Sequence, residues 1–186
     1  MSKSRLQPAV FLDRDGVINV DTGYVHDEHD FEFIDGVFES AKALKERGYL
    51  IVVVTNQSGI ARGYFTEDRF LSLTQWMDWN FEDNGVELDG IYYCPHHAEK
   101  GVGDYKIECD CRKPKPGMFH SAQQFLNIDL EKSVMVGDKA DDMRAAEAAG
   151  IGTKILVRTG KAVTEEGEAL ADVVLDSIGN VADYLS

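Results

Sequence analysis

Short apolar runs alternate with amphipathic stretches along almost the whole chain. The runs are rich in β-branched side chains and almost free of polar residues, which is typical of strands buried on both faces of a sheet. They comprise Ala9–Leu12, Leu50–Thr55, Gly90–Cys94, Val134–Gly137 and Lys154–Val157, with Val173–Leu175 a weaker sixth. Helical patterns fill the intervals. The sequence therefore predicts an α/β fold, a doubly wound parallel sheet between two helical layers, with a ligand site beyond the carboxyl ends of the strands.

Three of the helical patterns have recognisable ends. Gly48 and Gly150 directly follow two of them, as expected for a glycine just past a helix C-terminus. Thr66 precedes a third, which runs to about Asn84, and its hydroxyl is a candidate N-cap.

Length and charge limit the classes of protein to which this chain can belong. Its 186 residues predict a single domain over 1–186. With 33 acidic and 19 basic residues the net charge is −14, so we expect neither nucleic acid nor an anionic membrane as a partner, and we expect a monomer. No apolar stretch approaches the ~20 residues of a membrane span, and no signal-like segment follows the N-terminus. We therefore expect a cytoplasmic protein.

The first apolar run ends in two acids, Asp13 and Asp15, followed by Gly16. The chain leaves the strand at this point, and Gly16 permits a sharp turn, so the two carboxylates can converge. Converging acids repel unless a cation or a shared proton neutralises them, which predicts Mg²⁺ binding or acid–base chemistry. Taken alone, such a pair is more often two solvated loop acids.

Three further strand ends carry polar or charged groups. Thr55–Ser58 offers hydroxyl and amide groups that suit an oxyanion, although the segment is equally typical of an ordinary turn. Arg112 and Lys113 lie in a proline-stiffened basic segment that suits phosphate, and a solvated basic loop is the alternative. Asp138, beside Lys139, ends the fourth run. Because these ends would meet at one edge of the sheet, together they predict a site for phosphate and metal.

The three cysteines and one histidine form a C-x-H…C-x-C pattern, namely Cys94, His96, Cys109 and Cys111. An odd number of cysteines argues against a disulfide framework, whereas Cys₃His is a closed tetrahedral ligand set for zinc. A complete set leaves no position for water, so we expect a structural zinc ion that fixes the neighbouring basic segment. The alternatives are free thiols with an incidental histidine, and His97 in place of His96.

Taken together, these motifs resemble the haloacid dehalogenase (HAD) superfamily of phosphotransferases over the full chain. The resemblance implies that Asp13 is the nucleophile that forms an aspartyl-phosphate, and that Asp15 is first the general acid and then the base. It implies that Thr55 and Lys113 hold the transferring phosphoryl group. It also implies Mg²⁺ bound by Asp13, the backbone carbonyl of Asp15 and Asp138. An acid at the second position favours phosphate hydrolysis over dehalogenation.

The segments between the motifs leave no room for a cap domain, so we expect an open, capless site. This small form with a zinc-stapled loop resembles two bacterial groups, the heptose-bisphosphate phosphatases and the histidinol-phosphate phosphatases. The stretches Asn19–His26, Val54–Gly63 and Asp89–His97 favour the first group. That resemblance implies a small phosphorylated sugar as substrate, and a place in nucleotide-heptose synthesis for cell-surface lipopolysaccharide.

The residues that this resemblance implies for substrate contact are Asp21, Thr22, Gly23, Tyr24, Thr55, Asn56, Gln57, Ser58, Arg112, Lys113 and Lys139. Among them, Arg112 suits the second phosphate, which stays on the product. Histidinol phosphate or another small phosphomonoester is the alternative substrate. A zinc-stabilised binding module without catalysis is the alternative from another class.

Four aromatic or imidazole side chains have simpler explanations. Flanking acids predict that His26 and His29 are solvated surface residues. Trp76 and Trp79 lie at helical spacing and predict a packing face.

Overall fold

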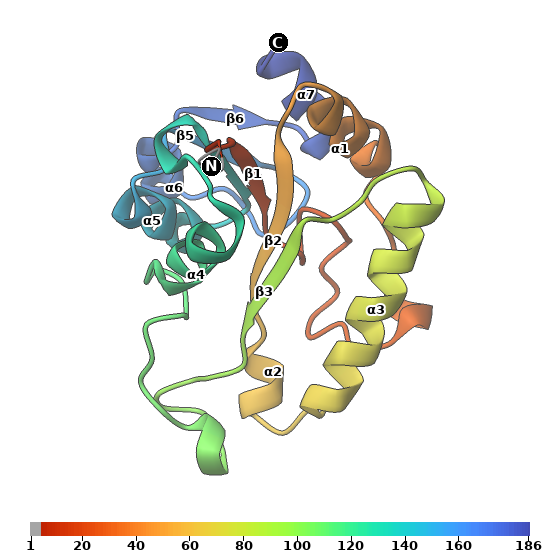
Figure 1. The fold of residues 1–186 in the computed structure, drawn as a ribbon. Coiled ribbons are helices and arrows are strands. Elements are labelled where there is room, and N and C mark those ends of the chain that lie inside the picture. Colours follow the sequence, from red (N-terminus) through yellow and green to blue (C-terminus); the bar gives the residue numbers. More distant parts are fainter. Residues whose placement is uncertain (1–4) are drawn as a thin grey trace.

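A six-stranded parallel sheet forms the centre of the structure, a computed structural model that describes residues 5–186 (Figure 1). Its strands are β1 (Ala9–Leu12), β2 (Leu50–Asn56), β3 (Gly90–Cys94), β4 (Val134–Gly137), β5 (Thr153–Val157) and β6 (Val173–Leu175). The order across the sheet is β3-β2-β1-β4-β5-β6, and all five pairings are parallel. The chain winds outward from β1 in one direction and then returns to wind outward in the other. The predicted doubly wound fold is thus confirmed.

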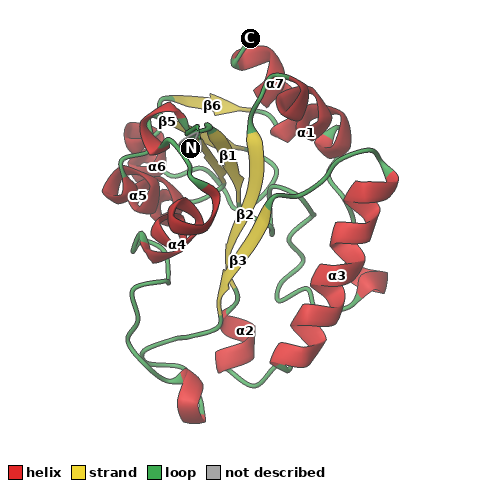
Figure 2. Ribbon diagram, viewed as in Figure 1, coloured by secondary structure: helices red, strands yellow, loops and turns green. Residues whose placement is uncertain are grey.

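Helices cover both faces of the sheet (Figure 2). One layer holds α1 (Val37–Glu46), α3 (Glu67–Asp83) and α7 (Val181–Tyr184), and the other holds α4 (Gly117–Leu126), α5 (Ala140–Ala149) and α6 (Glu165–Leu170). The short helix α2 (Ser58–Ala61) follows the carboxyl end of β2. Single 3₁₀ turns lie at Glu28–Asp30, Gly103–Tyr105, Leu130–Lys132 and Ile178–Asn180. No cap domain interrupts the described chain, since the loops at 16–36 and 57–66 hold only single turns of helix.

The helix ends follow the chemistry of their sequence. The hydroxyl of Thr66 accepts a hydrogen bond from the Arg69 N–H at 3.1 Å, which caps α3 as expected. Gly48 and Gly150 have φ of +92° and +83°, left-handed values that an L side chain adopts only with strain. These three predicted ends are confirmed.

Alternation along β1 divides the core into two layers. Val10 and Leu12 face the α1/α3/α7 side, whereas Ala9 and Phe11 face the α4/α5/α6 side. The expectation of strands buried on both faces holds for β1 and β4 and fails for β3 and β6. The latter two are the edges of the sheet, so each is only half-buried along most of its length.

The packing face predicted from the two tryptophans is half correct. Trp76 lies against Phe33, with ring centroids 5.7 Å apart, whereas Trp79 is 54 % exposed. The buried positions of α3 are Phe70, Leu73, Met77 and Phe81, and a residue two positions after Met77 points away from that stripe. Among residues 5–186, the structure contains no helix with the length and apolar character needed to cross a bilayer.

Two phenylalanines of α4 test the core on the side of β1 that Phe11 faces. Phe119 is 0 % exposed and meets the Phe11 ring edge-on at 4.9 Å, whereas Phe125 is 78 % exposed. We expect Phe119→Ala to lower the free energy of unfolding by about 3–5 kcal/mol, because it leaves a cavity. Phe125→Ala is the matched control and should change it by less than about 0.5 kcal/mol. Urea denaturation of both variants measures this, and equal effects would contradict the assigned core.

Candidate active site

Polar side chains meet where the three central strands end. Asp13 follows β1, Thr55 lies near the end of β2, and Asp138 follows β4. Since Leu12 pairs with both Val53 and Val136, these ends lie side by side at the point where the winding direction reverses. In parallel α/β sheets this reversal opens a crevice for ligands. A cavity of about 300 Å³ is present at this edge.

The cavity gathers most of the residues that the sequence assigned to substrate, namely Asp13, Asp15, Asp21, Gly23, Tyr24, Asn56, Gln57, Ser58, Arg112, Lys113 and Lys139. Thr55 and Asp138 are almost fully buried and are not part of its wall. Thr22 is exposed and lies outside the lining.

A buried lysine and two carboxylates form the floor. Lys113 Nζ lies 3.2 Å from Asp13 Oδ1 and 2.7 Å from Asp142 Oδ1, and it donates to the Val54 carbonyl at 3.0 Å. Burial, opposed by Lys113, raises the pKa of Asp13 to about 8. Burial alone would lower the pKa of Lys113, but the two carboxylates hold it above its usual value. Lys113 is therefore a fixed cation beneath the cavity.

The backbone of Lys113 is held from the neighbouring strand. Asn56 donates through Nδ2 to the Lys113 carbonyl at 3.1 Å and accepts from the Lys113 N–H through Oδ1 at 3.0 Å. Both ends of one amide thus bind one residue. The basic segment is tied to the end of β2 by this pair of hydrogen bonds.

One carboxylate oxygen of Asp138 makes no hydrogen bond within residues 5–186. Its Oδ2 accepts from the Lys161 N–H at 2.8 Å, whereas its Oδ1 is buried and has no hydrogen-bond partner within residues 5–186. Burial and the nearby Asp142 raise the pKa of Asp138 to about 6. A methyl group at Gly160 would collide with this carboxylate, so glycine permits the close approach.

Three carboxylates, those of Asp13, Asp138 and Asp142, place oxygens within 4.8 Å of one another. Asp142 is already engaged: Oδ1 binds Lys113, and Oδ2 accepts from the N–H groups of Asp138 and Lys139 at 3.1 and 3.2 Å. Asp13 and Asp138 therefore offer the oxygens that a hard cation such as Mg²⁺ could bind. Asp142 instead neutralises Lys113 and caps α5.

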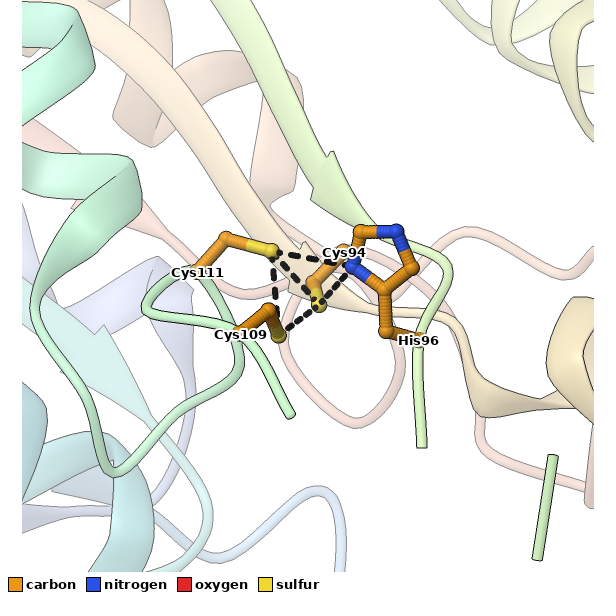
Figure 3. A group of neighbouring side chains, drawn as sticks. All are labelled: Cys94, His96, Cys109 and Cys111. Atoms are coloured by element: carbon orange, nitrogen blue, oxygen red, sulfur yellow. Dashed lines mark hydrogen bonds between the residues drawn. The ribbon is translucent and has the colours of Figure 1, made fainter. Parts of the chain in front are cut away.

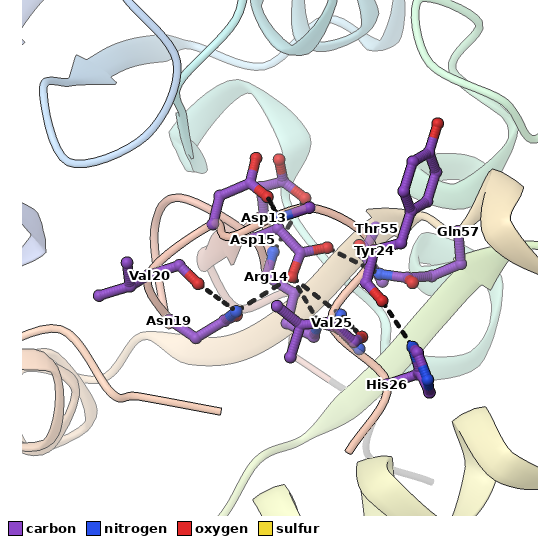
Figure 4. Close-up of polar contacts among 12 residues, drawn as sticks. Asp13, Arg14, Asp15, Asn19, Val20, Tyr24, Val25, His26, Thr55 and Gln57 are labelled. Carbon is purple, nitrogen blue, oxygen red and sulfur yellow. Dashed lines mark hydrogen bonds and ion pairs between the residues drawn. The ribbon is translucent and has the colours of Figure 1, made fainter. Parts of the chain in front are cut away.

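Asp15 lies at the centre of a hydrogen-bond network (Figure 4). Its Oδ1 accepts from Arg14 and from Asn19 Nδ2, the latter at 3.0 Å. Its Oδ2 accepts from Gln57 Nε2 at 3.1 Å, and the same amide nitrogen donates to Thr55 Oγ1 at 3.0 Å. One glutamine thus joins the ends of β1 and β2.

The outer wall of the cavity is aromatic and cationic. Tyr24, with φ of +49°, packs edge-on against Tyr64 with ring centroids 4.8 Å apart, and the Arg62 guanidinium lies 5.8 Å from its ring centre. His29 is exposed as expected, whereas His26 is half-buried and stacks on Phe65 at 5.0 Å. The acids that flank His26 in sequence predicted a solvated side chain and did not indicate the stacking on Phe65.

The cysteines and His96 converge between the end of β3 and the segment that leads to α4 (Figure 3). The Cys109 sulfur lies 3.5 and 3.4 Å from those of Cys94 and Cys111, which are themselves 2.8 Å apart. His96 Nδ1 lies 3.7 Å from Cys94 Sγ and 3.5 Å from Cys111 Sγ. Most of these spacings approach the edges of a tetrahedron around zinc, about 3.5–3.8 Å.

The protonation of this cluster also suits a metal. The contact with Cys94, together with His96 and against the effect of burial, lowers the pKa of Cys111 to about 5. The same contact and burial raise the pKa of Cys94. The pair therefore supplies a thiolate at neutral pH, and thiolate is the form that binds zinc. His97 is turned elsewhere, since its Nδ1 lies 3.2 and 3.0 Å from the N–H groups of Glu99 and Lys100.

Known proteins share this architecture. A HAD-hydrolase-like family model matches residues 110–181. D-Glycero-β-D-manno-heptose-1,7-bisphosphate 7-phosphatase of Vibrio cholerae is 78% identical over 179 residues, 96% of each chain. The protein of that name from Escherichia coli K12 is 60% identical over 174 residues, 94% of this chain and 91% of the other. The chain belongs to this family of heptose-bisphosphate phosphatases.

A solved relative agrees with this assignment. D,D-Heptose 1,7-bisphosphate phosphatase from B. bronchiseptica, determined in complex with magnesium and phosphate, superposes with a TM-score of 0.80 at 29% identity. The match covers 96% of this chain and 97% of that one. Membership of the family makes the strand-end cavity the candidate active site.

Among the residues to which the sequence gave no role are Arg14, Arg62, Asp142 and Lys161. Asp142 could have been found, because it lies in the first turn of the helix that follows Asp138, where a carboxylate suits the helix N-terminus. Arg14 alternates with the two acids and would be expected to point away from them, but the turn after β1 folds its side chain back onto Asp15. Arg62 and Lys161 come from loops whose course the sequence does not indicate.

Neighbouring acids at the start of α5 test the ionic floor. Asp142 is buried, and its carboxylate pairs with Lys113 and accepts from two backbone N–H groups. Asp141 is exposed and pairs with Arg144 at 3.0 Å. We expect Asp142→Ala to lower the free energy of unfolding by about 3–5 kcal/mol, since it leaves a buried charge poorly paired. Asp141→Ala should lower it by less than about 1 kcal/mol. Chemical denaturation of the two variants decides, and similar values would refute the role given to Asp142.

Proposed function

We propose that this chain is a Mg²⁺-dependent phosphomonoester hydrolase that removes the C7 phosphate of D-glycero-β-D-manno-heptose 1,7-bisphosphate and leaves the C1 phosphate in place. The observation that carries the proposal is the convergence of Asp13, Asp15 and Lys113 on one cavity, in a chain 78% identical to a phosphatase of that name. A nucleophile, a proton donor and a buried cation are what stepwise phosphoryl transfer needs.

In the first step Asp13 attacks phosphorus. Its contacts within residues 5–186 fall on Oδ1, which accepts from the Arg14 N–H at 2.8 Å and pairs with Lys113, so Oδ2 is the attacking oxygen. The bond from phosphorus to the C7 oxygen breaks, and its electron pair stays on the sugar. Asp15 gives that oxygen a proton. Lys113 stabilises the charge that spreads over the phosphoryl oxygens, whereas Thr55, which does not line the cavity, holds the Gln57 amide through its hydroxyl.

In the second step water releases the phosphate. Asp15, now ionised, takes a proton from water as the water oxygen attacks the phosphorus of the aspartyl-phosphate. The bond to Asp13 breaks, inorganic phosphate leaves, and both carboxyl groups return to their starting states. One carboxyl group serves as acid and then as base because the two steps are opposite in their demand for a proton.

Asp13, Asp138 and the backbone carbonyl of Asp15 would hold Mg²⁺. The fit rests on the buried, unpartnered Oδ1 of Asp138 and on the excess of carboxylates over Lys113 around it. When bound, the ion supplies the positive charge that lets an anionic carboxylate approach an anionic phosphate. The magnesium and phosphate in the B. bronchiseptica relative support this assignment.

The rim of the cavity favours a bisphosphate over histidinol phosphate. Arg112 reaches the cavity with a buried Nη1 that has no partner within residues 5–186, and Arg62 lines the same wall. Two guanidinium groups on the wall of the same cavity suit a second phosphate. Asp21 and Tyr24 offer hydrogen bonds to sugar hydroxyls, and Asn56, Gln57, Ser58 and Lys139 complete the surface.

We assign a structural zinc ion to Cys94, His96, Cys109 and Cys111. Three sulfurs and one nitrogen at near-tetrahedral spacing support it, and the set is closed to water. Cys111 directly precedes Arg112, so the ion would fix the guanidinium that receives the distal phosphate. We further propose that the protein is a cytoplasmic monomer with a single domain, and that it acts in nucleotide-heptose synthesis for lipopolysaccharide. The net charge of −14 agrees with the absence of a nucleic-acid or membrane partner.

Asp13→Asn tests the chemistry. The amide keeps the shape of the side chain and cannot attack phosphorus, so we expect turnover of the heptose bisphosphate to fall by at least about 10⁴-fold. The melting temperature should barely move, because the amide is isosteric with the acid and Lys113 keeps its ion pair with Asp142 at 2.7 Å. Phosphate release with Mg²⁺ is the assay, run beside histidinol phosphate. Appreciable turnover by the variant would exclude Asp13 as nucleophile, and a preference for histidinol phosphate would overturn the substrate.

Adjacent histidines test the zinc site. We expect His96→Ala to lose zinc, and to raise KM for the bisphosphate because Arg112 is then less firmly held. His97→Ala, whose imidazole binds its own loop, should keep about one zinc per chain. Elemental analysis of the purified variants is the measurement. Zinc retained by His96→Ala and lost by His97→Ala would reverse the ligand assignment.

A further inference from the structure

Among residues 5–186, Arg14 is the largest side chain that is completely buried, and it lies between the two active-site acids in sequence. It does not line the cavity. Its guanidinium carbon lies 5.7 Å from the centre of the Phe31 ring and 5.8 Å from that of Phe70. A permanently charged group is therefore enclosed by aromatic side chains directly behind the site.

Two of the three hydrogen bonds of this guanidinium go to one atom, Asp15 Oδ1. Nε and Nη2 both donate to Asp15 Oδ1, at 3.1 and 2.8 Å, and Nη2 also donates to the Val25 carbonyl at 2.7 Å (Figure 4). Nη1 is buried without a partner within residues 5–186. Burying a charge with an unsatisfied N–H is costly, and an apolar side chain of similar length would fill this space more stably. The ion pair thus points to a role other than stability.

The consequence for Asp15 is that its two oxygens are no longer equivalent. Oδ1 accepts three N–H donors, two from Arg14 and one from Asn19, and a guanidinium has no acceptor to offer a proton in return. Oδ2 meets Gln57 alone within the described chain, and both of these residues line the cavity. Oδ2 is the oxygen left to face a bound phosphate ester.

We propose that Arg14 is a positioning residue that fixes the Asp15 carboxyl group so that Oδ2, and not Oδ1, exchanges a proton with the leaving group. The inference rests on the proposed function, in which Asp15 is the general acid. As the bond from phosphorus to the sugar oxygen breaks and the bond to Asp13 forms, the proton on Oδ2 moves to the sugar oxygen. The negative charge left on Asp15 is met by the guanidinium already in place.

Leaving-group dependence separates this role from a structural one. An alkoxide needs the proton from Asp15, whereas a nitrophenolate leaves without it, and kcat/KM covers only the steps up to departure of the leaving group. The substrates are the heptose bisphosphate and a series of phenyl phosphates whose phenols span a range of pKa. The variants are Arg14→Met, which keeps length without charge, and Arg14→Lys, which keeps the buried cation.

Two further variants serve as controls. Phe70→Leu trims the ring beside the guanidinium without touching Asp15 and should lower stability without changing the leaving-group dependence. Asp15→Asn removes the acid itself and sets the full effect. Melting curves of all four variants identify any that fail to fold, and Arg14→Lys then carries the test alone.

We expect Arg14→Met to lose about 10²-fold in kcat/KM on the heptose bisphosphate, through kcat with KM nearly unchanged, and less than about 3-fold on the best aryl ester. Arg14→Lys should lie between wild type and Arg14→Met. Equal losses on all esters would overturn the inference and leave Arg14 a structural residue. If kcat/KM depends steeply on the leaving-group pKa in Asp15→Asn but not in Arg14→Met, the inference about Arg14 is wrong and the proposed function stands. If the leaving-group dependence of kcat/KM in Asp15→Asn is no steeper than in the wild type, both the inference about Arg14 and the proposed function are wrong.

Discussion

The ionic contact of Lys113 with Asp13 and Asp142 is the interaction on which the rest of the site depends. Three groups that would each be unstable alone in the core are tolerable together, since every charge has an opposite neighbour within 3.2 Å. The contact joins the carboxyl end of β1 and the first turn of α5 to the basic segment before α4. Burial, opposed by Lys113, still raises the pKa of Asp13 to about 8.

Most of the fold, and the position of the site, follow from the sequence because parallel strands oblige their carboxyl ends to share one edge. Three polar strand ends, at Asp13, Thr55 and Asp138, could be placed together without knowing any distance, whereas Lys113 reaches the same edge from the segment before α4. The direction of single side chains could not. Whether Arg14 points outward or folds back depends on the turn that follows β1, and whether Trp79 packs depends on its angular position around α3. The half-buried edges β3 and β6 likewise follow from strand order, which short apolar runs do not disclose.

The basic segment that holds Arg112 and Lys113 is fixed from two sides, by the Asn56 amide and by the cysteine cluster. Asn56 binds the backbone of Lys113 from the side of β2, and the cysteine cluster holds the chain immediately before it from the side of β3. Neither contact involves the ammonium or guanidinium groups themselves. Lys113 Nζ already contacts Asp13, Asp142 and the Val54 carbonyl, whereas the buried Nη1 of Arg112 has no partner within residues 5–186. The held segment thus presents a guanidinium donor at one place, which is how an acidic chain can attract a phosphorylated molecule.

The hold of Asn56 on Lys113 spans 57 residues of sequence, and the long loop between His96 and Cys109 lies within that interval. Because the proximal cation is anchored to the sheet and not to this loop, insertions or deletions in the loop need not disturb the floor of the cavity. Mutation can therefore reshape what the rim recognises while the reaction at the nucleophile stays the same. A single amide thus separates the evolution of specificity from the preservation of chemistry.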